Sequence, residues 1–307
     1  MTISRRAFLK YCIGASTLLG LDVSVVGNLN KLLADELTMP NIVWLEGAAC
    51  SGCSVSLANL IGDETDQGPT DLVDLLTSYV NLSFAKTFMS ATGDAAVSQL
   101  KDATAGEFIL VVEGGIPTAF DGMACTVYTA DGQEVTMSQA VSEYASKASM
   151  VVCVGTCASF GGIPASGSNP TGVVTVQTLT GIPTINLPGC PAHPDWIAGT
   201  LAAVICGQTP ELDDLGRPTA FYGKTIHSQC PRKPLYDQGR FADYLGQEGR
   251  CLFKLGCQGP YTYADCPTRG WNNGHNYCVQ SNSNCIGCVE PGFPSPTLIT
   301  RRSHRRE

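Results

Sequence analysis

The feature that most restricts the fold of this chain is a series of short apolar runs, most of which lead into loops rich in glycine. They are NIVWLE (41–46), EFILVVEG (107–114), ASMVVCVG (148–155) and PTINLPG (183–189). Stretches with leucines at helical spacing, such as PTDLVDLLTSYV (69–80), lie between them. Buried apolar strands that alternate with helices predict an α/β fold with a parallel, doubly wound sheet.

Three of these strands lead into loops that carry cysteines: GAACSGC, GTCASFGG and PGCPAHPDW. Ligands of such sheets gather at the carboxyl ends of the strands, so cysteines far apart in the sequence are expected to meet there. Four thiolates suit a 4Fe–4S cluster, with one thiolate for each iron. A structural zinc ion, or a disulfide within CSGC, fits the same spacing. The four cysteines of this first group are Cys50, Cys53, Cys157 and Cys190.

The region after about residue 205 is dense in Gly, Pro, Asn and Cys and lacks long apolar runs. Ligands bound to metal are therefore expected to organise it. A second group joins HSQCP to CLFKLGC, and its one histidine and three cysteines fit either zinc or a cluster. A third group again has four cysteines. The second group is His227, Cys230, Cys251 and Cys257, and the third is Cys266, Cys278, Cys285 and Cys288.

The remaining cysteines and histidines carry weaker signals. Cys153 lies inside an apolar run and is expected to be a small core residue. His193 is predicted to support the first group through a hydrogen bond, while His275 and His304 are expected at the surface. Three zinc sites would make the chain a scaffold, whereas three clusters would make it an electron conductor. The cysteines left without a group are Cys12, Cys125 and Cys206.

Composition and motifs exclude several classes of function. The net charge of −8 argues against nucleic-acid binding. No Ser/His/Asp grouping and no G-x-G-x-x-G motif is present, and GGIPASG lacks the lysine of a P-loop. Hydrophobic residues make up 44% and charged residues 15% of the chain, which predicts a large face buried against a partner.

The N-terminus predicts export. SRRAFLK (4–10) matches a twin-arginine signal, and we place its cleavage near Ala34. This route carries folded proteins, so metal would occupy the cysteines before they reach an oxidising compartment. No further long hydrophobic run follows, so the mature protein is expected in the periplasm without a transmembrane segment of its own.

Taken together, the motifs resemble the small subunit of nickel–iron hydrogenases. They include WLEGAACSGCS, VEGGIPT, VGTCASFGGIPA, PGCPAHPDW, GRPTAFYGKTIHSQCP, GCQGPYTYADCP and CIGCVEP, in the order of that family. The resemblance implies a signal peptide (1–34), a flavodoxin-like domain with one cluster (35–204) and an irregular iron–sulfur domain with two clusters (205–307). It also implies an obligate large subunit, which holds the nickel–iron centre.

The resemblance assigns each group of ligands to a cluster. The first group corresponds to the proximal cluster, the third to the medial cluster and the second to the distal cluster. Many members have a proline where this chain has Cys278, and their medial site holds a 3Fe–4S cluster. The fourth thiolate here predicts a medial 4Fe–4S cluster of lowered potential, so that all three clusters are of the 4Fe–4S type. This pattern looks most like the nickel–iron–selenium branch.

Two further comparisons within the family concern the proximal site. Oxygen-tolerant members carry two extra cysteines there, at the positions of Gly52 and Gly162 in this chain. We therefore expect an ordinary proximal cluster with four cysteines. Many members also have Glu or Asp before the first proximal cysteine, where this chain has Ala49.

The predicted function is electron transfer within a periplasmic hydrogenase. Electrons would pass between the large subunit, which converts H2, and an acceptor such as a c-type cytochrome. No catalytic residue is expected in this chain. Two alternatives are the small subunit of a cytoplasmic cofactor-reducing hydrogenase or of the respiratory complex, and a zinc-binding scaffold.

Overall fold

The computed structural model describes residues 13–14, 16–17, 19–20, 40–62 and 69–295. The twin-arginine motif, the expected cleavage site at Ala34 and His304 lie outside these residues. Within the described ranges, no helix combines the length and the apolar character needed to span a bilayer.

The centre of the molecule is a five-stranded parallel sheet with the order β2-β1-β3-β7-β9. This order is that of a flavodoxin-like sheet and confirms the predicted fold class. All four predicted strands are present, most of them shorter than their apolar runs. The second strand in the chain, β2, was missed by the sequence analysis. The strands are β1 (Asn41–Glu46), β2 (Asn81–Ala85), β3 (Phe108–Glu113), β7 (Met150–Val154) and β9 (Ile185–Leu187).

Helices and two small antiparallel pairs complete this part of the molecule. Pairs form between β4 (Ile116–Pro117) and β8 (Val173–Val174), and between β5 (Thr126–Ala130) and β6 (Gln133–Thr136). The helical elements are α3 (Gly52–Ala58), α4 (Leu72–Asp74), η2 (Leu75–Tyr79), α5 (Gly93–Thr104), α6 (Met137–Ala145), α7 (Thr156–Phe160), α8 (Val176–Thr180) and α9 (Pro194–Ile205).

Each face of the sheet has its own core, because successive side chains of a strand point to opposite faces. Ile42 and Trp44 of β1 pack with residues of α3 and α9, among them Trp196, which is fully buried. Val43 and Leu45 pack on the other face, with residues of α5 and α6. The sheet is thus covered on both sides, as its continuous apolar runs predicted.

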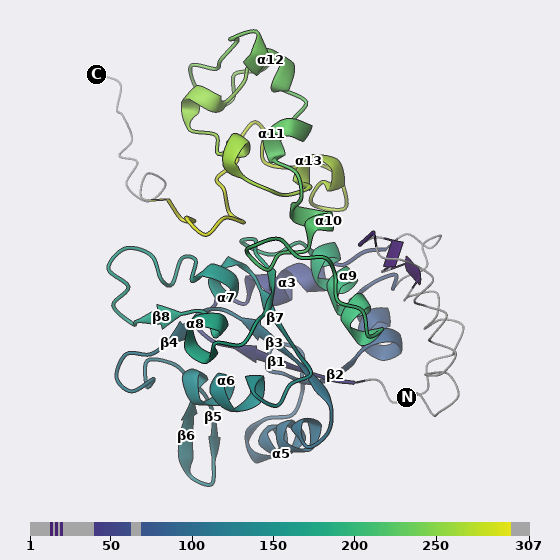
Figure 1. The fold of residues 1–307 in the computed structure, drawn as a ribbon, viewed down its shortest axis with the longest axis vertical. Coiled ribbons are helices and arrows are strands. Elements are labelled where there is room, and N and C mark those ends of the chain that lie inside the picture. The colour runs from purple at the N-terminus through teal and green to yellow at the C-terminus, as the bar shows by residue number, and fades with distance from the viewer. Residues whose placement is uncertain (1–12, 15, 18, 21–39, 63–68, 296–307) are drawn as a thin grey trace.

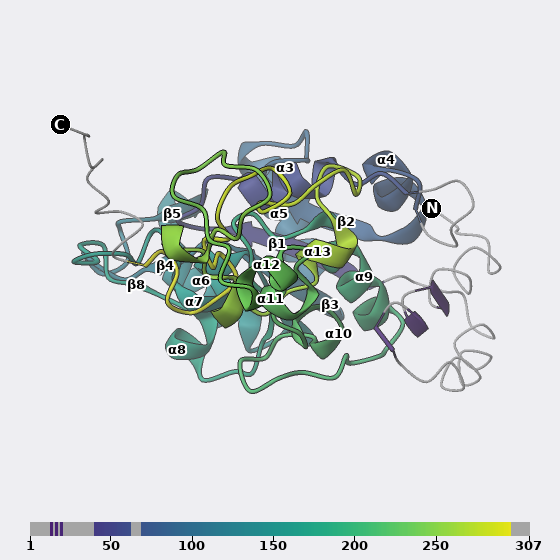
Figure 2. The ribbon, with the colours of Figure 1, turned by 90° about the horizontal axis from the view of Figure 1, so that it is seen from above.

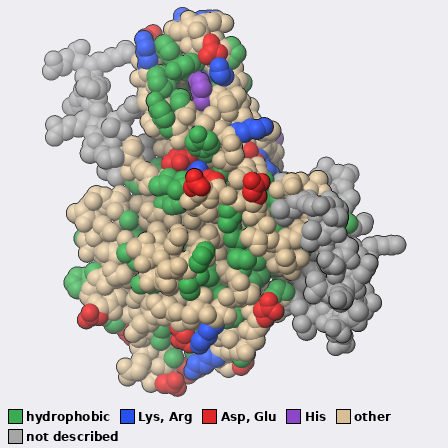
Figure 3. Space-filling model, viewed as in Figure 1, with side chains coloured by type: hydrophobic (Ala, Val, Ile, Leu, Met, Phe, Trp, Pro, Cys, Tyr) green, Lys and Arg blue, Asp and Glu red, His purple; other side chains and the backbone are tan. Residues whose placement is uncertain are grey.

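The chain after α9 forms a separate region at one end of the sheet (Figure 1). Seen from above, its elements lie over the sheet and its covering helices (Figure 2). Its regular elements are short helices, joined by loops and isolated β-bridges, as the sequence predicted for this region. On the face shown in Figure 3, charged side chains are scattered among wide uncharged areas. The helices are α10 (Thr219–Tyr222), α11 (Ile226–Gln229), α12 (Lys233–Asp237), η3 (Phe253–Leu255), η4 (Gly259–Tyr261) and α13 (Cys266–Arg269).

Candidate metal centres

The first group of cysteines comes together at the carboxyl ends of β1, β7 and β9. Cys157 lies in the first turn of α7, directly after β7, and Cys190 follows β9. The two loops are held together by hydrogen bonds from Thr156 N to Gly189 O at 3.0 Å and from Gly189 N to Thr156 Oγ1 at 2.9 Å. We call Cys50, Cys53, Cys157 and Cys190 the proximal set.

Glycines shape the space around the proximal set. Gly155 has φ of +86°, and a Cβ atom there would lie 2.6 Å from Cys53 Sγ. A Cβ atom at Gly52 would lie 2.9 Å from Cys50 Sγ, and one at Gly162 would lie 3.0 Å from Cys157 Sγ. Side chains at these positions would fill the space beside the thiols, so the glycines keep that space open for a bound group.

A buried carboxylate orders the loop of Cys53. Glu113, at the end of β3, accepts hydrogen bonds from Cys53 N at 2.9 Å and Ser54 N at 3.3 Å. Its other oxygen accepts one from Trp44 Nε1 at 3.0 Å. The carboxylate thereby satisfies amides at the N-terminus of α3, which holds the cysteine loop against the sheet. The sequence analysis did not assign this role, although Glu113 stands in the VEGGIPT motif.

The pKa values of the proximal thiols show how close these groups lie. Burial is the main cause that raises the pKa of Cys53, and Glu113, Cys157 and Cys190 add to it. Burial, with Cys190, Cys50 and Glu113, raises the pKa of Cys157 to about 11. Cys53 and Cys157 thus lie near other acidic groups, and a bound multivalent cation or cluster would offset the repulsion between their thiolates and these neighbours.

The third group also comes together, and we call Cys266, Cys278, Cys285 and Cys288 the medial set. Burial raises the pKa of Cys288 well above its usual value, and the other three thiols of the set contribute. Cys278 also raises the pKa values of Cys266 and Cys285, behind burial, which is the largest cause in both. Cys278, which is itself exposed, therefore lies within electrostatic reach of the three others and also of Cys257 in the distal set.

The second group, called the distal set, lines one small pocket in the region after α9. His227 lies in α11, Cys230 ends that helix, and Cys251 and Cys257 flank η3. All four side chains line the pocket. Arg232 N donates a hydrogen bond to Cys230 Sγ at 3.4 Å, and the Tyr277 hydroxyl donates another at 3.4 Å.

Direct contacts join the three sets in series. Thr156 Oγ1, next to Cys157 in the chain, donates a hydrogen bond to the Cys288 carbonyl and so links the proximal and medial sets. Gln258, next to Cys257, donates its backbone N–H to the Cys285 carbonyl at 2.8 Å and so links the medial and distal sets. These hydrogen bonds place the medial set between the proximal and the distal sets.

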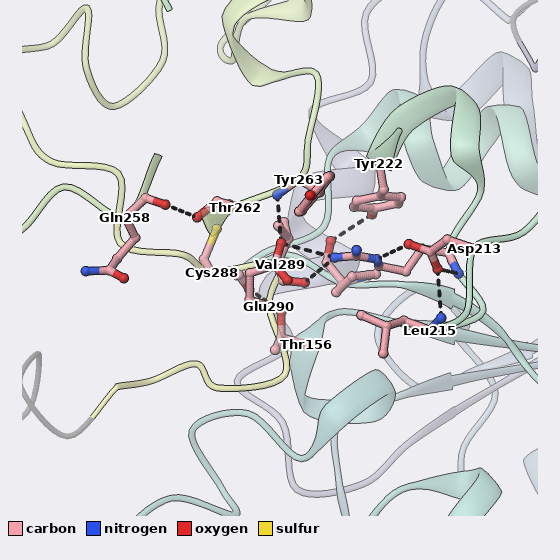
Figure 4. Close-up of polar contacts among 12 residues, drawn as sticks. Thr156, Asp213, Leu215, Tyr222, Gln258, Thr262, Tyr263, Cys288, Val289 and Glu290 are labelled. Atoms are coloured by element: carbon pink, nitrogen blue, oxygen red, sulfur yellow. Dashed lines mark hydrogen bonds and ion pairs between the residues drawn. The ribbon is translucent and has the colours of Figure 1, made fainter. Parts of the chain in front are cut away.

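A buried cation ties the segment that carries Cys288 to the loop before α10 (Figure 4), and the carbonyl of Gly216 in that loop accepts a hydrogen bond from Asn186 N of β9 at 2.7 Å. Arg217 is only 4% exposed and pairs with Asp213 Oδ2 at 2.8 Å and Glu290 Oε1 at 3.2 Å. It also donates to the Val289 carbonyl at 3.3 Å, and Glu290 accepts from Tyr263 N at 2.7 Å. These contacts fix the segment that carries Cys288.

The spacing of the thiols bears on which group the sets hold. In the described part of the chain, no three Cys, His, Asp or Glu side chains lie close enough to bind a single metal ion. Zinc would need four ligands at about 2.0–2.3 Å from one point. A cubane cluster places one iron between each thiolate and the cluster centre, and so requires wider spacing. Sets of four ligands that converge without this single-ion geometry are compatible with iron–sulfur clusters.

Other predicted residues have different surroundings. His193 does not bond to a thiol: its Nε2 lies 2.8 Å from Gly270 O, and its Nδ1 accepts from Asp195 N at 3.1 Å. The prediction that it supports the proximal group by a hydrogen bond is therefore wrong, because the ring caps α9 instead. Cys153 is buried in β7, as expected, and His275 is exposed.

Comparisons with known proteins show which family the chain resembles. The family model for the C-terminal part of the NiFe/NiFeSe hydrogenase small subunit matches residues 222–299, and that for the NADH ubiquinone oxidoreductase 20 Kd subunit matches residues 50–204. The periplasmic [NiFeSe] hydrogenase small subunit of Desulfomicrobium baculatum is 40% identical, over 96% of this chain and 97% of that protein. The periplasmic [NiFe] hydrogenase small subunit of Solidesulfovibrio fructosivorans is 35% identical, over 95% and 90%.

Solved structures of hydrogenases are similar to this chain as well. A chain of the H2-activated [NiFeSe] hydrogenase of D. baculatum superposes with a TM-score of 0.77 at 40% identity, covering 84% of this chain and 96% of that one. A chain of the recombinant [NiFeSe] hydrogenase of Desulfovibrio vulgaris Hildenborough gives 0.79 at 38% identity, covering 84% and 95%. The chain studied here belongs to the small-subunit family of nickel–iron hydrogenases.

Proposed function

We propose that this chain carries electrons through three 4Fe–4S clusters in a periplasmic hydrogenase of the nickel–iron–selenium type. The proximal, medial and distal sets would each supply four ligands to one cluster. The observation that carries the proposal is their connection in series by hydrogen bonds, from Thr156, next to Cys157, to the Cys288 carbonyl and from Gln258, next to Cys257, to the Cys285 carbonyl. A scaffold protein would not need such an order, whereas an electron conductor depends on it.

The residues of the chain hold, space and shield the clusters. When bound, an iron–sulfur cluster takes up and releases single electrons. Cys50 is exposed, so the proximal site opens to the surface, where the large subunit with the nickel–iron centre would dock. Cys53 is buried and Cys288 is partly buried, which lowers the polarity of the surroundings of the clusters. The half-buried His227 places the distal site near the outside, within reach of a c-type cytochrome.

The proposed periplasmic location and the proposed nickel–iron–selenium type rest on different observations. The SRRAFLK motif supports twin-arginine export, and the relatives from D. baculatum and S. fructosivorans are named periplasmic. The position of Cys278 beside the rest of the medial set supports a 4Fe–4S cluster there. A selenium-containing hydrogenase is the enzyme type named for the D. baculatum relative.

The glycines beside the proximal set support an ordinary cluster. Gly52 and Gly162 abut Cys50 Sγ and Cys157 Sγ, so the two positions at which oxygen-tolerant members carry extra cysteines contribute no side chain here. We infer a proximal cluster with four thiolate ligands and two redox states.

The experiment that tests the proposal separates H2 chemistry from electron output. In the purified heterodimer, Cys230→Ala removes one distal ligand. We expect exchange between H2 and D2O to persist, because it occurs in the large subunit, while H2-driven reduction of a multihaem c-type cytochrome falls at least tenfold. Cys125→Ala, outside all three sets, is the control. Unchanged cytochrome reduction by Cys230→Ala, with the distal cluster absent, would contradict the relay.

A further inference from the structure

Tyr277 stands between the medial and distal sets. It precedes Cys278 in the chain, and its side chain is only 3% exposed. Its hydroxyl donates a hydrogen bond to Cys230 Sγ at 3.4 Å. Tyr277 is thus the chain neighbour of Cys278 in the medial set and a hydrogen-bond donor to Cys230 in the distal set.

The backbone of Tyr277 is also fixed. Its N–H donates to Gln280 Oε1 at 3.2 Å, and its carbonyl accepts from Ser281 N at 3.0 Å. The buried ring and this fixed backbone together hold the hydroxyl beside Cys230. Within the described part of the chain, the other donor to this sulfur is Arg232 N at 3.4 Å.

A hydrogen bond to a cluster ligand changes the potential in a known direction. Adding one electron to a cluster increases the negative charge on its thiolate sulfurs. A donor therefore stabilises the reduced form more than the oxidised form, and the potential rises.

We propose that the Tyr277 hydroxyl raises the reduction potential of the distal cluster through its hydrogen bond to Cys230. This inference rests on the distal set proposed above. With Tyr277 in place, the distal cluster competes better for the electron held by the medial cluster. Tyr277 acts on the cluster through its ligand and takes no part in H2 chemistry.

The test is a redox titration of the purified heterodimer with Tyr277→Phe. Pulsed EPR identifies the distal cluster by the nitrogen coupling of His227, so its potential is measured separately from the others. We expect the equilibrium constant for electron transfer from the medial to the distal cluster to fall about two- to tenfold, which corresponds to a drop of about 18–59 mV.

The control is Tyr236→Phe. The Tyr236 ring lies 4.6 Å from the His227 ring, but in the described part of the chain its hydroxyl makes no hydrogen bond to a thiol of the distal set. We expect its distal potential to be unchanged. A second variant, with 3-fluorotyrosine at position 277, keeps the packing and is a stronger donor, so the potential should rise.

Two results would overturn the inference. An unchanged distal potential in Tyr277→Phe, with iron and sulfide at wild-type content, shows that the hydrogen bond does not act on the cluster. The absence of nitrogen coupling in the wild-type protein contradicts the distal set itself, and so removes the inference together with that part of the proposed function.

Discussion

A single residue, Cys278, decides the composition of the proposed medial site. Its thiol lies close to Cys266, Cys285 and Cys288. We expect Cys278→Pro to convert the medial cluster from the 4Fe–4S to the 3Fe–4S type and to raise its potential, since one thiolate and one iron are lost. EPR of the oxidised heterodimer should then show a strong 3Fe–4S signal that is absent from the wild type.

The matched control for this change is Cys125→Ser. Cys125 is half-buried and belongs to none of the three sets. Its replacement should leave the EPR spectrum unchanged. A strong 3Fe–4S signal in intact wild-type protein would show that Cys278 is not the fourth ligand.

Gly155 is required beside the proximal set for two reasons. Its φ is +86°, and a Cβ atom would lie 2.6 Å from Cys53 Sγ. With its ψ of 156°, Gly155 has a conformation essentially restricted to glycine, so Gly155→Ala should cost about 1–3 kcal/mol in backbone strain and also displace the thiol. We expect the variant to lose about four acid-labile sulfides, the content of one cluster.

Gly167→Ala separates these two effects. Gly167 has φ of +68°, but nothing lies within 4 Å of the position of its Cβ. The variant should show a lower melting temperature without loss of sulfide. Equal sulfide loss in both variants would mean that backbone strain alone, rather than crowding at Cys53, disrupts the site.

At the scale of elements, the N-terminus of α9 makes stability depend on pH. His193 accepts a hydrogen bond from Asp195 N and is buried beside Trp271. Burial is the main cause that lowers the pKa of His193, and Arg269 lowers it further, whereas Asp195 and Asp265 raise it. The unfolded chain therefore binds the proton more readily than the folded chain.

The lowered pKa of His193 determines in which direction the stability of the protein changes with pH. The contribution of His193 to stability is present above the unfolded pKa of about 6.5 and is lost as the pH falls below it. We expect His193→Asn, which keeps a capping side chain, to flatten the fall in melting temperature between about pH 7 and pH 5. His275→Asn, at an exposed site, should leave the slope as it is; an unaltered slope in His193→Asn would contradict this account.

The segment that carries Cys288 depends on Arg217 for its attachment to the loop before α10. Arg217→Met leaves Asp213 and Glu290 without their cation, so we expect a loss of about 3 kcal/mol in the free energy of unfolding. Lys147→Met breaks an exposed pair with Glu143 and should cost less than about 1 kcal/mol. The melting temperatures of heterodimers with Arg217→Met and with Lys147→Met are compared. Equal values would show that Arg217 does not stabilise this attachment.

Among the elements, the strands with buried apolar runs were predictable, including the edge strand β9, whereas the other edge strand, β2, was not. The runs that became β1, β3 and β7 are almost wholly apolar because both faces of the sheet are covered. The sequence of β2, NLSFA, mixes polar and apolar residues, since it forms an edge of the sheet and its first residue is exposed. That pattern is too short and too polar to distinguish from a loop.

For the whole molecule, the sequence predicted which cysteines belong together but not how the three sets are connected. The motifs and the family resemblance grouped the ligands before the structure was considered. The hydrogen bonds of Thr156, Arg217 and Tyr277 span 132, 72 and 47 residues along the chain. No local pattern encodes such pairs, so they emerge only from the packed structure.

The central claim is that three 4Fe–4S clusters lie in series within this chain. The most direct test is the content of acid-labile sulfide and zinc in the purified heterodimer, since sulfide comes from clusters and not from the nickel centre. Three clusters predict about twelve sulfides per heterodimer and no stoichiometric zinc. Zinc in stoichiometric amount, with about eight sulfides or fewer, would contradict the account.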